Sequence, residues 1–224
     1  MNLASRLKYI FGATVRRKTL DNLLGDCLEY FEGDLVVLDI GGRDRGNFKK
    51  PKESVKKWIF ADINSSHDPD VVLNVADMSA IKNNFVDIVL ATELFEHVSK
   101  PEKGIGECFR VLKKKGVFII SAPFLYRIHN DPDDFQRWTD EKWRRELRKT
   151  GFKVERFEVM GRFFSVMADN FRFFVQSLPR LLRYILYPLV LVSDLVSLLD
   201  KTNFVLENNV LSSFHGGYFM IFRK

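Results

Sequence analysis

The sequence predicts an α/β fold with a parallel β-sheet covered by helices. Short, nearly continuous apolar runs alternate with segments of helical periodicity, a pattern typical of strands buried on both faces. The run from Leu35 to Ile40 contains Asp39 near its end and turns at once through Gly41 and Gly42. Glycines there allow left-handed backbone angles and close approach of a ligand to the main chain. We therefore expect a ligand-binding edge around this turn.

Length and composition favour one domain with one sizeable core, because the chain has 224 residues. The formal net charge of +6 suits an anionic membrane surface or acidic substrate, or simply a solvated surface. Basic residues form no dense block, so we expect no nucleic-acid partner. Cys27 and Cys108 fit apolar helix positions, which predicts a reducing, cytoplasmic location with neither a disulfide nor a metal site. The N-terminal stretch lacks a small-residue cleavage site, so we expect no secretory signal.

The elements follow from periodicity and from start and stop signals. Residues 3–31 carry two helical stripes, the first including Leu3, and they should cover a sheet edge or cap the ligand site; the first could instead rest on a membrane. Pro101 opens a helix that Gly116 should stop, and Thr139 caps another that ends before Gly151. Pro51 should keep the first crossover short or irregular. Strands are predicted at 35–40, 58–63, 71–75, 86–91, 117–122, 152–159 and 217–222.

The segment 162–214 forms a predicted helical insertion. Its apolar run from Leu181 to Leu199 nearly reaches membrane-spanning length, but Arg183 and Asp194 would be costly in hydrocarbon. We expect two apolar helices broken near Pro188 that form a lid over the acceptor site. Two alternatives remain: the insertion dips into an anionic membrane and presents a lipid-linked acceptor, or it packs on the sheet or on a second subunit.

Acidic residues follow three successive predicted strands, where a parallel sheet binds its ligands. Asp62 suits a carboxylate that accepts hydrogen bonds from ribose hydroxyls, and Asp77 suits an exocyclic amino group such as that of adenine. The glycines do not match the G-x-G-x-x-G pattern of dinucleotide sites. A nucleoside without a diphosphate explains both observations. Each aspartate could instead cap a turn, although their common position at one edge favours ligand binding.

At this point the chain resembles the class I S-adenosylmethionine-dependent methyltransferases, in particular the methyltransferase type 11 group. The matching stretches include VVLDIGG, WIFADIN, VADM and FVDIVLATELFEHVSKPEKGIGECFRVLKKKGVFIISAPF, followed by IHNDPDDFQRWT. The resemblance implies a Rossmann-like, seven-stranded, mostly parallel sheet with helices on both faces and an antiparallel last strand. The domain would comprise N-terminal helices (1–33), a core (35–161 and 215–224) and the helical insertion (162–214).

The resemblance also implies S-adenosylmethionine as the cofactor and assigns residues to its parts. Asp62 would hold the ribose, Ile63 would pack against the adenine, and Thr92 would line the cofactor beside the fourth strand. Arg43 departs from the family pattern, which usually has a glycine there, so a binding protein without catalysis is the alternative function. The remaining assignments are Asp39, Gly41 and Gly42 at the methionine moiety and Asp77 with Met78 at the adenine amino edge.

Methyl transfer needs an aligned acceptor and, for a hydroxyl acceptor, a base. His129, in the loop after the fifth strand, is the first candidate, and His97 is the second; each could instead tie a loop together. Tyr126 and Arg137 are candidates for acceptor binding, although Arg137 could pair with aspartates of the same loop.

The predicted activity is therefore methyl transfer (EC 2.1.1.-) to a small-molecule, sugar or lipid-linked acceptor. The expected location is the cytoplasm, with peripheral membrane contact through the insertion as an option. A nicotinamide-dependent oxidoreductase is disfavoured by the missing glycine pattern. The sequence leaves the oligomeric state open.

Overall fold

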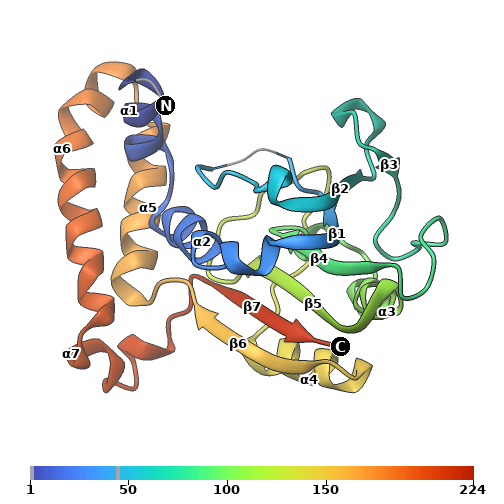
Figure 1. Ribbon diagram of the computed structural model, residues 1–224. Coiled ribbons are helices and arrows are strands. Elements are labelled where there is room, and N and C mark those ends of the chain that lie inside the picture. Colours follow the sequence, from blue (N-terminus) through green and yellow to red (C-terminus); the bar gives the residue numbers. More distant parts are fainter. Residues whose placement is uncertain (1–2, 44–45) are drawn as a thin grey trace. The chain divides into compact units, whose positions relative to one another are not determined.

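The computed structural model describes residues 3–43 and 46–224, with side chains from residue 5 onward (Figure 1). The chain divides into two compact units. A helical unit contains the described residues of Met1–Gly25, Gly46–Phe48 and Val159–Gly217, and a sheet unit contains those of Asp26–Arg45, Lys49–Glu158 and Tyr218–Lys224. The expectation of a single domain stays a prediction.

One seven-stranded sheet runs in the order β3-β2-β1-β4-β5-β7-β6. The pairs β1–β2, β1–β4, β2–β3 and β4–β5 are parallel. Strand β7 is antiparallel to its neighbours, because Lys224 N donates to Gly116 O (3.1 Å) and Met160 N donates to Gly217 O (2.8 Å). The predicted fold class is thus confirmed. The strands are β1 (Gly33–Ile40), β2 (Val55–Asp62), β3 (Val71–Val72), β4 (Val86–Thr92), β5 (Leu112–Pro123), β6 (Lys153–Val159) and β7 (Gly217–Arg223).

The core of the sheet unit lies along the central strands. In register, Val37 of β1 sits beside Ile88 of β4, and Ile88 in turn sits beside Val117 of β5. All three side chains are buried, as are most others in β4, β5 and β7. Because both faces of these strands are covered, their sequences read as continuous apolar runs and not as alternating ones.

Two helices of the sheet unit contact each other, α3 (Pro101–Val111) and α4 (Asp140–Thr150). Thr139 Oγ1 accepts from Lys142 N at 3.3 Å, and Gly151 takes a φ of 108°, so both predicted caps of α4 are present. Helix α3 ends earlier than predicted, at Val111, because Leu112 is extended and pairs with Val86 of β4.

Two connections bear on the site. In the described residues of the crossover after β1, 41–43 and 46–54, the one helical segment is a 3-10 turn, Lys52–Ser54, as expected for a short, irregular crossover. The third strand is shorter than the predicted 71–75, because the chain turns back at Asn74. There, Asp77 N donates to Asn74 O at 2.9 Å. This turn decides which residues of the third strand end can face a ligand.

The helical unit combines segments that are far apart in sequence. Within it, α1 (Leu3–Gly12) contacts α6 (Arg180–Val196), and α2 (Val15–Gly25) contacts α5 (Phe163–Ser177); α5 and α6 run side by side (Figure 1). A 3-10 segment, Ser197–Lys201, and α7 (Asn203–Leu206) follow α6. The predicted role of Leu3 in the first stripe concerns a side chain outside the described residues.

Two buried charged side chains of α5 form hydrogen bonds with the backbone at the ends of α1 and α2. Asp169 of α5 accepts from the backbone N–H groups of Val15 (2.5 Å) and Arg16 (3.2 Å), at the N-terminus of α2. The fully buried Arg172 donates to the carbonyl oxygens of Ile10 (3.0 Å) and Phe11 (2.8 Å), at the C-terminus of α1. Each charge has the sign that complements the helix dipole, and each satisfies backbone groups that a helix end leaves unpaired.

The predicted helix break near Pro188 is wrong. Helix α6 continues through Pro188, and the break lies earlier, at Leu178 and Pro179. Leu178 is extended, with φ −75° and ψ 158°, which is the conformation that a following proline favours. The apolar run that was predicted to form two helices is therefore one unbroken helix, α6, which follows α5.

Candidate active site

A cavity of about 580 Å³ opens at the carboxyl ends of the parallel strands. Its volume is in the range of small-molecule and cofactor sites. Five segments of the sheet unit contribute to it: the ends of β1 to β4 and the loop that follows β5. The lining residues are Ile40, Gly41, Arg43, Asp62, Ile63, Asn64, His67, Leu73, Asn74, Val75, Glu93, Leu94, His97, Val98, Ser99, Asp131, Pro132, Asp133 and Phe135.

Asp39 does not line the cavity but organises the turn beside it. Its side chain is fully buried; Trp58 Nε1 donates to its Oδ2 at 3.0 Å, and Lys50 Nζ lies 2.9 Å from the same atom. Burial raises the pKa of Asp39, and the Lys50 ammonium opposes that shift. Lys50 also donates to the carbonyl oxygen of Gly42, so one ammonium fixes both the carboxylate and the turn.

Both predicted glycines of the turn are required, for different reasons. Gly41 lines the cavity, has a φ of +67° and donates its N–H to Ala61 O at 2.8 Å. Gly42 does not line the cavity, but a Cβ there would lie 1.8 Å from Asp39 Oδ1. The carboxylate that stabilises the turn thus occupies the space of a side chain at Gly42.

Asp62 and Ile63 line the cavity at the end of β2. The Asp62 carboxylate accepts from Asn64 N at 2.9 Å through Oδ1, and its Oδ2 lies 3.0 Å from His67 Nδ1. Each carboxylate oxygen can accept a second hydrogen bond, so the group remains suitable for ribose hydroxyls. Ile63 is 61% exposed and offers an apolar surface beside it, as an adenine ring would need.

At the third strand end the structure brings Asn74 and Val75 to the cavity. Asp77 lies outside it, and its Oδ1 accepts from Ser79 N at 3.2 Å, which is the turn-capping alternative. Met78 is fully buried and also does not line the cavity. Asn74 was not among the predicted site residues, because the prediction for this strand end rested on the Asp77 carboxylate. The available signal was an amide side chain directly after the apolar pair Val72 and Leu73.

At the end of β4 the cavity wall is formed by Glu93 and Leu94, and Thr92 is not part of it. Thr92 pairs in register with Ser121 of β5. The Ser121 hydroxyl donates to Glu93 Oε1 at 2.9 Å, which holds the Glu93 side chain against the neighbouring strand. The cofactor-lining role of Thr92 stays a prediction.

The loop after β5 is anchored to the short helix η4 (Phe95–His97), which follows β4. Phe135 N donates to Glu96 O at 2.8 Å, and Gln136 Nε2 donates to the carbonyl oxygens of Phe95 and Val98 at 2.8 Å each. These bonds bring residues far apart in sequence together at one wall of the cavity.

The two histidines predicted as bases lie at this junction. His97 lines the cavity, whereas His129 does not. Tyr126 packs edge-on against the His129 ring, with centroids 5.3 Å apart. Burial lowers the pKa of His129, and the nearby His97 lowers it further, so its neutral form is favoured.

Arg137 pairs with Asp134 of the same loop, with Nη2 2.6 Å from Asp134 Oδ2. Its hydrogen bonds lower the pKa of Asp134 to about 2. This is the second of the two roles considered for Arg137. Its contact with an acceptor, like that of Tyr126, stays a prediction.

Arg43 extends from the glycine turn across the cavity wall. It donates to Asp131 of the β5 loop, and its Nη1 lies 3.3 Å from His67 Nε2. Arg43 N donates to Gly41 O at 2.9 Å, so the main chain remains tightly turned without a glycine at this position.

Comparison with known proteins identifies the domain around this cavity. Residues 28–120 match the methyltransferase domain family of the type 11 group. This segment is a methyltransferase domain. The matched residues include β1, β2 and β4 with the turns that line the cavity, so the predicted family is confirmed. No curated protein matches the chain at a significant level.

Solved structures share the fold at low sequence identity. An S-adenosylmethionine-dependent methyltransferase from Archaeoglobus fulgidus matches with a TM-score of 0.62 and 16% identity over 100% of both chains. Phosphoethanolamine N-methyltransferase 2 from Haemonchus contortus, solved with S-adenosylmethionine, matches with a TM-score of 0.55 and 16% identity over 91% of this chain and 52% of that one. The cyclase SpnF matches with a TM-score of 0.55 and 16% identity over 91% and 81% of the two chains. These likenesses support the Rossmann-like methyltransferase fold.

We expect Gly42→Ala to destabilise the domain by about 1–3 kcal/mol, because the new Cβ would collide with Asp39 Oδ1. Urea unfolding measures the change. Gly106→Ala is the matched control: it lies in α3 with no atom within 4 Å of its Cβ position, and should stabilise by roughly 0.5–1 kcal/mol. Equal stability of Gly42→Ala and the wild type would contradict the account of the turn.

Proposed function

We propose that the chain transfers the methyl group of S-adenosylmethionine to a small-molecule, sugar or lipid-linked acceptor. The observation that carries the proposal is the cavity of the methyltransferase domain, with Asp62 and Ile63 side by side at the end of β2. A carboxylate beside an exposed apolar side chain provides the two interactions that a nucleoside needs, one for ribose and one for the base.

S-adenosylmethionine is the cofactor of the domain, and the polar and apolar groups around the cavity fit it. When bound, it supplies a methyl group that is already activated on a sulfonium. Gly41 exposes backbone to the ligand, and Asn74 and Val75 provide an amide and an apolar surface after β3, the strand next to β2. Asp39 Oδ1 is buried and has no hydrogen-bond partner among residues 3–43 and 46–224, which leaves an acceptor atom at the turn.

The main task of the protein in this reaction is alignment, since the donor needs no further activation. The loop after β5 would hold the acceptor, because Asp131, Asp133 and Phe135 line the same cavity as the glycine turn. For a hydroxyl acceptor, Nε2 of His97 or of His129 would receive the proton. The lowered pKa of His129 keeps that atom available near neutral pH.

We expect Asp62→Ala to weaken S-adenosylhomocysteine binding roughly tenfold to a hundredfold, because hydrogen bonds to a charged acceptor contribute about 1.5–3 kcal/mol. Isothermal titration calorimetry measures the affinity, and circular dichroism checks that the fold is intact. Asp70→Ala is the matched control, since Asp70 also lies near β2 but does not line the cavity. Unchanged affinity in Asp62→Ala would reject the ribose assignment and with it the proposed cofactor pose.

The acceptor could be lipid-linked because the helical unit exposes an apolar helix. The 22-residue stretch Arg180–Lys201 has a mean hydropathy of 1.7, and by length and composition it could cross a membrane. Within the unit, however, Asp194 pairs with Lys18 (2.7 Å) and with Arg172, so one side of the helix is held by charges. We therefore propose that the helix lies along a membrane surface.

The opposite side of this helix carries exposed apolar residues at helical spacing. Leu181, Ile185, Val192 and Leu195 are between 52% and 73% exposed. Such a stripe is larger than the scattered apolar residues of an ordinary surface. Arg180 and Lys201 at its two ends are exposed and would favour anionic lipids.

We expect the full-length protein to float with anionic vesicles in a density gradient, and the variant Ile185→Glu/Leu195→Glu to remain at the bottom. Burying each of these side chains contributes about 1.5–3 kcal/mol, which the charges would remove. Val210→Glu is the matched control, because Val210 is 67% exposed but lies outside the helix. A wild type that sediments, or a double variant that still floats, would refute the membrane proposal without affecting the cofactor site.

A further inference from the structure

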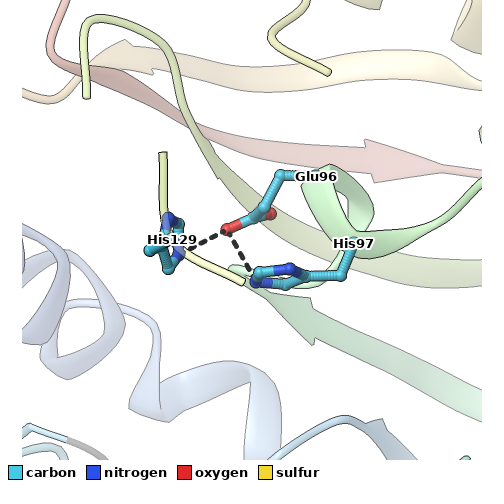
Figure 2. Close-up of side chains that lie close together, drawn as sticks. All are labelled: Glu96, His97 and His129. Carbon is cyan, nitrogen blue, oxygen red and sulfur yellow. Dashed lines mark ion pairs between the residues drawn. The ribbon is translucent and has the colours of Figure 1, made fainter. Parts of the chain in front are cut away.

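Three side chains that could bind a metal ion converge beside the cavity (Figure 2). Glu96 and His97 belong to η4, and His129 comes from the loop after β5. Glu96 Oε1 lies 3.8 Å from His97 Nε2 and 4.0 Å from His129 Nε2. One possible ligand atom from each of the three residues lies within 4.8 Å of the other two. Glu96 is only 2% exposed, so its carboxylate is shielded from bulk water.

Hydrogen bonds on the far side of each imidazole define which nitrogen carries the proton. His97 Nδ1 lies 2.5 Å from the carbonyl oxygen of Asp133. His129 Nδ1 lies 3.4 Å from both Arg127 O and Asp134 Oδ2. Because these oxygens only accept, each Nδ1 must donate, and the lone pair of each neutral ring is then on Nε2. Both lone pairs face the Glu96 carboxylate.

If both rings are neutral, these electron-rich atoms repel one another. Either a proton that makes an imidazole an ion-pair partner of Glu96 or a metal cation between the groups removes that repulsion (Figure 2). The distances of 3.8 and 4.0 Å are too long for hydrogen bonds. They are somewhat wider than the roughly 3.3–3.6 Å between two ligands of a tetrahedral ion with bonds of about 2.0–2.2 Å, so a small rotation of these side chains brings them to ligand spacing. His97 Nε2 is buried and has no hydrogen-bond partner in the described part of the chain. Histidines that bind a metal ion also usually donate their other ring N–H to a carbonyl or carboxylate oxygen, as both Nδ1 atoms do here.

We propose that Glu96, His97 and His129 bind a divalent transition-metal ion. Two imidazoles and one carboxylate favour ions of the zinc, manganese or iron type over magnesium or calcium. No metal site was predicted from the sequence, because the two cysteines fit apolar helix positions and no further cysteine or histidine cluster lies near them; His97 and His129 are 32 positions apart. Three protein ligands leave a coordination position open, as in catalytic metal sites.

The role of this metal site rests on the proposed function, because its ligand His97 lines the cavity in which methyl transfer is proposed. An ion held there would lie beside the cavity wall that His97 forms, where it would bind an acceptor oxygen and lower the pKa of its hydroxyl. With the ion bound, both Nε2 atoms are ligands, and the hydroxyl proton passes to solvent instead of to a histidine. The ion-free protein retains the histidines as bases.

The test uses full-length protein without a histidine tag, treated with a chelator and titrated with Co²⁺, whose visible absorption reports its ligands. We expect saturable binding of one equivalent, displaced by Zn²⁺. His129→Gln should weaken the affinity at least roughly tenfold, as the loss of a ligand does. His215→Gln is the matched control, because His215 is outside the cluster.

The absence of saturable Co²⁺ binding, or equal affinity in His129→Gln and the wild type, would overturn the metal site. Calorimetry with S-adenosylhomocysteine on the same metal-free samples separates the two proposals. Retained cofactor binding without Co²⁺ binding refutes only the metal site, whereas loss of cofactor binding in the wild type refutes the proposed function.

Discussion

The ion pair between Asp39 and Lys50 is the interaction on which the candidate active site depends. The Asp39 carboxylate lies at the end of β1 with its side chain fully buried, and the Lys50 ammonium from the following loop neutralises its charge. Loss of Lys50 alone would leave a buried charge, which costs about 3–5 kcal/mol. The same ammonium donates to Gly42 O. Lys50 therefore both neutralises Asp39 and fixes the backbone conformation of the glycine turn.

The sheet and one edge of the cavity were predictable because they follow from local rules. Continuous apolar runs identify buried parallel strands, and parallel strands deliver their carboxyl ends to one edge. That rule was sufficient to find Gly41, Asp62 and His97, and the family resemblance added Ile63; all four residues line the cavity. It also pointed to Asp39, whose structural role beneath the turn needed the three-dimensional positions of Lys50 and Trp58.

The remaining features depend on contacts between distant segments, which periodicity does not encode. The turn after β3 decides that Asn74 and not Asp77 reaches the cavity. The loop after β5 folds onto η4, and only that contact brings His129 to Glu96. In the helical unit, Asp169 and Arg172 hold helix ends more than 150 positions away. Each is a tertiary contact that overrides local propensity.

The central claim is that the cavity binds an adenosyl methyl donor, and a thermal unfolding comparison tests it most directly. At about 100 times its Kd, S-adenosylhomocysteine should raise the Tm by roughly 5–10 °C, since ligand binding of that strength stabilises by about 2.7 kcal/mol. NAD should leave the Tm unchanged. A shift with NAD and none with S-adenosylhomocysteine would contradict the account.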